Sequence, residues 1–163
     1  MKYLNKRSIK LTNQEISEFI TDHLPYRIKV LEILESYPYK INSDPLWPSV
    51  YESAQITSRM FIQFMGFGVE IDIKGIPHLK ESRNYYSADK INSYEVKIID
   101  LGFEFISLSE LKDEKQMLLA HAYESGNKAT AHLTYKSPFE PNPKKVIQAS
   151  KIIREILKNK LSI

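Results

Sequence analysis

The 163-residue sequence contains no cysteine and only five glycines. The absence of cysteine excludes disulfides, thiolate nucleophiles and zinc ribbons, and it suits a reducing compartment, so we expect a cytoplasmic protein. So few glycines disfavour phosphate-cradling loops and the repeated tight turns of β-rich folds. The sequence also lacks the GxGxxG, GxxxxGK[ST] and GxSxG motifs, which leaves no nucleotide or serine-hydrolase signature.

Long apolar runs are missing as well. The longest extend for only a few residues, whereas a membrane-spanning helix needs about 20. The first ten residues, MKYLNKRSIK, are basic, but no apolar segment of the kind found in export signals follows them. From these absences we expect a soluble protein that does not engage a membrane.

What is present fits one folded domain over residues 1–163. Hydrophobic residues make up 42% and charged residues 26%, as in ordinary globular proteins. Helix signals recur along the chain. They comprise a capping box at Thr12 and Glu15, apolar periodicity over 26–34 and 49–65, and Asn142-Pro143 as the start of a last helix. A second capping box at Ser107 and Glu110 predicts a helix that runs at least to Ser125. The pattern predicts a mainly α, single-domain bundle of about five helices.

Two segments instead favour extended structure. Residues 69–73 alternate with period two, and residues 94–106 are again extended in character. In the main interpretation they form a small excursion from the bundle over 67–106. The alternative is an α+β domain in which these two segments pair as a true sheet.

The polar chemistry gathers between Gln116 and Tyr135. His121, Ser125, Lys128 and His132 follow at i, i+4, i+7 and i+11, which places them on one stripe of a helix. The two histidines would lie about 16 Å apart at the helical rise, too far to share a zinc ion. We therefore predict no metal and no cofactor.

Catalysis and packing both account for this stripe. A histidine near an amide and a cation can act as general acid or base on a phosphodiester, which makes His132, Lys128, Asn127, His121 and the more distant Arg59 catalytic candidates. HEPN-domain ribonucleases place an arginine in an R-x4–6-H motif, but here Asn127 stands where that arginine would be, so no family is assigned. The packing interpretation is favoured, because small residues surround the stripe and a histidine beside a helix–helix seam usually bonds a neighbouring polar group.

Positive charge is concentrated at the two ends of the chain. Residues 1–10 carry +4 and residues 141–163 carry +5, so residues 11–140 carry −6 of the net +3. Such polarity can steer a protein toward nucleic acid or an acidic partner. The candidate nucleic-acid-binding residues are Lys144, Lys151, Arg154 and Lys158 on the last helix, with Arg83 and Tyr85 in a basic-aromatic cluster.

The sequence is therefore compatible with two functions. The favoured one is a non-enzymatic interaction module, with homo-oligomerisation left open, whose basic termini engage nucleic acid or an acidic protein. The alternative is a HEPN-like, RNA-directed nuclease or toxin-type helical protein that uses His132 with Lys128 and Asn127.

Overall fold

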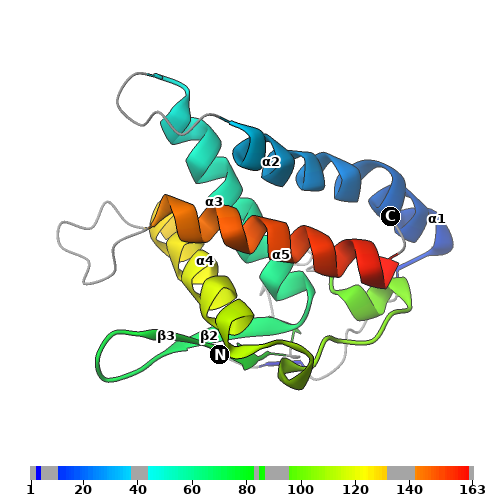
Figure 1. Cartoon of the computed structure of the whole chain (residues 1–163). Helices are drawn as coiled ribbons and strands as arrows, with labels where there is room; N and C mark the ends of the chain where they lie inside the picture. Colours follow the sequence, from blue (N-terminus) through cyan, green and yellow to red (C-terminus); the bar gives the residue numbers. More distant parts are fainter. Residues whose placement is uncertain are drawn as a thin grey trace.

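The computed structural model describes residues 3–4, 11–37, 44–82, 85–86, 96–131 and 142–161, with the backbone alone at 3–4, 85–86 and 128–131. The chain is mainly α with a small antiparallel hairpin, as predicted (Figure 1). The helices are α1 (Asn13–Glu18), the π-helical turn η1 (Phe19–His23), α2 (Leu24–Ser36), α3 (Trp47–Phe64), α4 (Asp113–Ala131) and α5 (Pro143–Leu161). Short 3₁₀ turns occupy Ile98–Leu101 (η2) and Leu108–Glu110 (η3).

The first helical stretch begins as its sequence predicts. The Thr12 hydroxyl accepts the Glu15 N–H at 3.2 Å, and the Glu15 carboxylate accepts the Thr12 N–H at 2.7 Å, so the capping box is confirmed. Pro25 does not stop the helix. Instead α1 continues through η1 into α2, and the Leu24 N–H bonds to the carbonyl of Phe19, five residues back.

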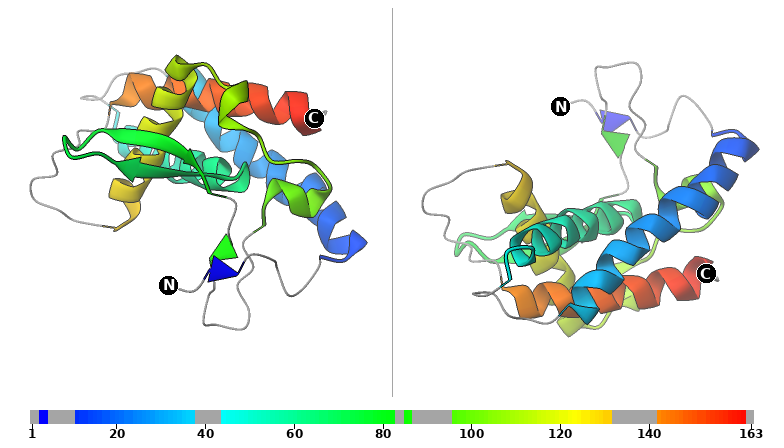
Figure 2. Two further views of the ribbon diagram at one scale, coloured as in Figure 1. Left: turned by 90° about the horizontal axis from the view of Figure 1, so that it is seen from below. Right: turned by 90° about the horizontal axis from the view of Figure 1, so that it is seen from above.

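The core lies where α2 and α5 pack against α3 and α4. Figure 1 shows α2 and α5 side by side and running in opposite directions, with α3 passing behind α5. In Figure 2, seen from above, α2 runs at an angle to α3, which it contacts. Burial of the apolar faces of these helices supplies most of the stability of such a fold. The core side chains with no exposed surface include Leu31, Leu34, Ile62, Leu119, Ile153 and Leu157.

The crossing of α3 and α4 depends on Gly126. A Cβ atom at this position would lie 2.6 Å from the carbonyl oxygen of Gln55 and 2.7 Å from the Cβ of Arg59. Ala122, one turn earlier on α4, is also fully buried. These small residues let the two backbones approach closely, and α4 runs through Gly126 to Ala131 without ending there.

The hairpin pairs β2 (Phe67–Ile71) with β3 (Pro77–Glu81) in antiparallel register, with Val69 opposite Leu79. It packs against α4. The α+β alternative, in which residues 69–73 pair with residues 94–106, is therefore wrong. The partner of β2 is the adjacent strand β3. Within the described part of the chain, residues 96–106 form η2 and irregular backbone. The local turn explains why β2 pairs with its neighbour. The Asp72 carboxylate accepts the N–H groups of Lys74 and Ile76, each at 2.8 Å, and so closes a short loop between the two strands. Closing this short loop costs less conformational entropy than closing the long loop that pairing with residues 94–106 would need. A second pair joins β1 (Tyr3–Leu4) to β4 (Tyr85–Tyr86).

The capping box at Ser107 forms, but the helix that it opens is short. The Ser107 N–H donates to the Glu110 carboxylate at 2.8 Å, and the box starts η3. The chain turns extended at Leu111, and α4 begins only at Asp113. The prediction of a continuous helix from this box to Ser125 is therefore wrong. By contrast Asn142 caps α5 as predicted, because its side-chain oxygen accepts the N–H of Lys144 at 3.0 Å.

The junction of α2 and α3 is built on aromatic rings. Trp47 is 3% exposed and begins α3. Its ring stacks on Tyr51 with centroids 5.7 Å apart and planes inclined by 7°, and it also contacts Tyr37 at 6.0 Å. Within the described segments no helix combines the length and the apolar character that crossing a bilayer requires.

Candidate functional site

The first two residues of the polar stripe on α4 face the interior of the fold. His121 and Ser125 are both buried, and the Ser125 hydroxyl donates to the backbone carbonyl of His121 at 2.8 Å. The side chains of Lys128 and His132 lie outside the described residues, so the pairing of these two predicted catalytic residues stays a prediction.

His121 connects α4 to the beginning of α5. Its Nε2 atom accepts the backbone N–H of Asn142, the residue that caps α5, at 3.0 Å. Burial, assisted by the positive charge of nearby Lys145, lowers the pKa of His121 from 6.5 to about 4. The imidazole is therefore neutral at physiological pH, and its Nε2 lone pair accepts a hydrogen bond from the start of α5. This is the packing role expected of a histidine between two helices.

Arg59 does lie alongside α4. Its guanidinium carbon is 5.7 Å from the ring centroid of Tyr123, a cation–π distance, and its Cβ packs at Gly126. Asn127 donates to the carboxylate of Glu124 at 2.8 Å, and Glu124 is only 3% exposed. The structure thus gathers Arg59, Glu124 and Asn127 at the α3–α4 crossing. Sequence reasoning missed Glu124, although its three-residue spacing from Asn127 signals a shared helix face.

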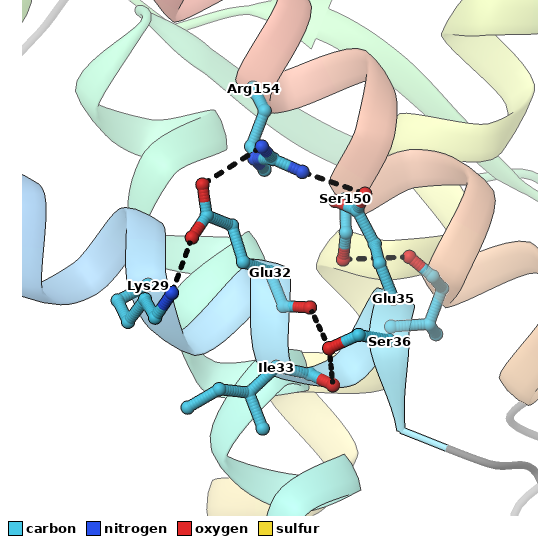
Figure 3. Close-up of polar contacts among 8 residues, drawn as sticks. Lys29, Glu32, Ile33, Glu35, Ser36, Ser150 and Arg154 are labelled. Atoms are coloured by element: carbon cyan, nitrogen blue, oxygen red, sulfur yellow. Dashed lines mark hydrogen bonds and ion pairs between the residues drawn. The ribbon is translucent and has the colours of Figure 1, made fainter.

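The predicted basic stripe of α5 divides into two sets of residues. Lys144, Lys151 and Lys158 are exposed. Arg154 is half-buried and turned toward α2, where it donates to Glu35 at 2.7 Å and to Glu32 at 2.9 Å (Figure 3). Two carboxylates thus accept bonds from the guanidinium, which gives less support to phosphate binding by Arg154, and that role stays a prediction.

The Arg154 cluster fixes α5 against α2. Glu32 also accepts a bond from Lys29 at 3.1 Å, and that bond, with the charge of Arg154, lowers the pKa of the Glu32 carboxyl. A groove of about 710 Å³ runs beside the cluster, lined by Pro25, Ile28, Lys151 and Lys158 among others. Since cations and carboxylates alternate around it, this groove offers no field of one sign.

Loss of the Arg154 side-chain charge is expected to destabilise the fold. We expect Arg154→Gln to lower the free energy of unfolding by about 1–2 kcal/mol, because Glu35 is left as a largely buried carboxylate without its cation. Lys158→Gln removes the same charge from the exposed face and should cost less than about 0.5 kcal/mol. Urea denaturation compares the two variants, and equal losses would contradict a structural role for the cluster.

The structure says little about the other predicted nucleic-acid-binding residues, Arg83 and Tyr85. The side chains of Arg83 and Tyr85 lie outside the described residues, although the backbone of Tyr85 pairs with Leu4. Among the described residues no three His, Cys, Asp or Glu side chains come together in the way that a metal site requires.

Comparison with known proteins identifies no relative. No protein-family model, no curated protein and no solved structure matches the chain.

Proposed function

We propose that this protein is a non-enzymatic interaction module that binds nucleic acid phosphates along α5. The observation that carries the proposal is a row of three exposed lysines, Lys144, Lys151 and Lys158, hereafter the lysine row. Their seven-residue spacing puts them on one face of α5, about 10 Å apart along its axis.

The lysine row differs from several other cations near it. Lys29, Lys115, Lys160 and Arg154 are all within 3.2 Å of a carboxylate oxygen. Among the described residues, no carboxylate forms an ion pair with a lysine of the row. Cations in a line that form no ion pair attract a chain of phosphates, and the release of counterions adds to the affinity. Lys151 and Lys158 also border the groove of mixed charge beside Arg154, so the attraction is expected on the solvent side of α5.

The nuclease alternative has less support. His121 is neutral, buried and bonded to the start of α5. Asn127 is bonded to Glu124. RNA cleavage by His132 with Lys128 and Asn127 stays a prediction, since the side chains of His132 and Lys128 lie outside the described residues.

The lysine row predicts salt-dependent binding. In fluorescence anisotropy, a labelled single-stranded RNA of about 20 nucleotides should bind at low ionic strength, and log K should fall against log salt concentration with a slope of about −2. The triple change of Lys144, Lys151 and Lys158 to Gln should remove most of the binding while the melting temperature stays close to that of the parent.

A matched control separates the lysine row from total charge. Changing Lys74, Lys80 and Lys112 to Gln removes the same three charges from other elements, and it should leave most of the affinity intact. Equal loss in the two triple variants would mean that binding follows net charge alone. Absence of RNA and DNA binding at low salt would defeat the proposal, and selective binding of polyglutamate would replace nucleic acid with an acidic protein partner.

A further inference from the structure

A cavity of about 360 Å³ at the C-terminal end of α3 indicates a second binding site. It lies between η1, the start of α2 and the last turns of α3, with Val96 closing one side. Its apolar walls are formed by Phe19, Met60, Phe61, Phe64 and Val96. Small-molecule sites typically have this character: concave, mostly apolar and a few hundred Å³ in volume.

The wide turn of η1 shapes one wall of the cavity. Pro25 has no N–H group, and its ring would collide with the carbonyl four residues earlier in a regular α-helix. The chain adopts the π-helical bond from Leu24 to Phe19 just before this proline. As a result the rings of Phe19 and His23 lie 6.2 Å apart, and Phe19 stacks on Phe64 at 5.9 Å. Single π-turns of this kind often occur at functional sites.

The guanidinium of Arg27 lines the cavity beside the polar side chains of His23 and Gln63. Its Nη1 donates to the sulfur of Met60 at 3.4 Å, and a thioether is a weak acceptor. In the part of the chain that the structure describes, no carboxylate pairs with this guanidinium. Arg27 therefore presents a planar, always charged donor group at the edge of an apolar cavity, without the anion that such a group favours.

A buried ammonium group lies behind the same wall. Lys97, next to Val96, is 1% exposed, and its Nζ donates to the carbonyl of Gln63 at 3.2 Å. Gln63 itself lines the cavity. The cation thus offsets the negative end of the α3 dipole, which would otherwise repel an anion from this position.

We propose that this cavity binds a small amphiphilic carboxylate, an aromatic or short acyl acid, with its apolar body between Phe19, Phe61 and Phe64 and its carboxylate on Arg27. The guanidinium supplies the paired donors that a carboxylate accepts, and the rings supply the apolar contact. No residue of the lysine row lines this cavity, so the site is independent of nucleic acid binding.

Two acids and their amides test the assignment. By isothermal titration calorimetry and amide-resolved NMR, 1-naphthoate or octanoate should bind at a single saturable site and shift resonances of η1 and the end of α3. The neutral amides of the same acids should bind more weakly. Arg27→Gln should weaken binding of the acid about tenfold or more and leave binding of the amide within about twofold.

Two further variants act as controls. Lys29→Gln removes one positive charge from the same helix outside the cavity and should leave all affinities within about twofold. Val96→Phe fills the cavity without changing charge and should abolish binding of acid and amide alike. The proposal is overturned if neither acid saturates below about 5 mM, if Arg27→Gln and Lys29→Gln weaken binding equally, or if acid and amide bind the parent equally well.

Discussion

Between pH 6.5 and pH 4, the free energy of unfolding is expected to fall by about 3 kcal/mol through His121 alone. The imidazole is buried at 8% exposure and takes up a proton in the folded protein only near pH 4. In the unfolded chain it takes up a proton at its ordinary pKa of 6.5. Between these two values the unfolded state therefore binds more protons, so stability is fully present above pH 6.5 and is lost as the pH falls.

The His121→Gln variant isolates this effect. A glutamine oxygen can still accept the N–H of Asn142, but it does not titrate. Carboxylates with lowered pKa values, such as Asp72 and Glu110, also destabilise the fold in acid, but they do so in parent and variant alike. Urea denaturation at a series of pH values should give curves that diverge from pH 6.5 downward, and parallel curves would show that His121 is not held neutral.

Replacement of Gly126 by valine should lower the free energy of unfolding by about 3 kcal/mol. The new Cβ would meet the Gln55 carbonyl at 2.6 Å and the Arg59 Cβ at 2.7 Å, and its two methyl groups add to the crowding. Backbone atoms of α3 cannot move aside as a flexible side chain can. Helices α3 and α4 must therefore separate, and the apolar contacts on either side of the crossing are lost.

The smaller substitution Gly126→Ala gives a stricter test, because the expected direction of its effect on stability is opposite to that at an ordinary helix position. At an ordinary helix position, alanine is about 1 kcal/mol more favourable than glycine, whereas Gly126→Ala should destabilise this fold. Asn159→Val, at an exposed position of α5, controls for the helix propensity of valine. It should lower the free energy of unfolding by only a few tenths of a kcal/mol. A Gly126→Ala variant as stable as the parent or more stable would contradict close packing at the crossing.

The elements that follow from local chemistry were predictable. Thr12 and Asn142 begin their helices because their side chains satisfy N–H groups within the next few residues. Local rules failed where two signals competed. The Ser107 box is satisfied by a single 3₁₀ turn, and Leu111 is buried in an extended conformation before α4 starts. The strand opposite β2 was missed because Pro77–Glu81 is polar on its exposed face and pairs through the backbone.

The candidate site was less predictable because it depends on packing between distant segments. Arg154 reads as one more cation of α5, and only the position of α2 brings Glu32 and Glu35 to it. Similarly, the sequence favours a packing role for the stripe at His121 and Ser125, but it does not show that the start of α5 is the partner of His121. Arg27 and Phe19 carry no motif at all, since their shared cavity exists only where the end of α3 meets η1.

The stacked Trp47 gives the molecule its own optical reporter. It is the one tryptophan of the chain, and its indole is shielded from water between aromatic neighbours. An indole in such surroundings emits at shorter wavelength than one in water, so its spectrum changes when the junction of α2 and α3 opens. Comparing this intrinsic fluorescence with far-ultraviolet circular dichroism across one denaturation curve would reveal whether that corner melts together with the helices or ahead of them.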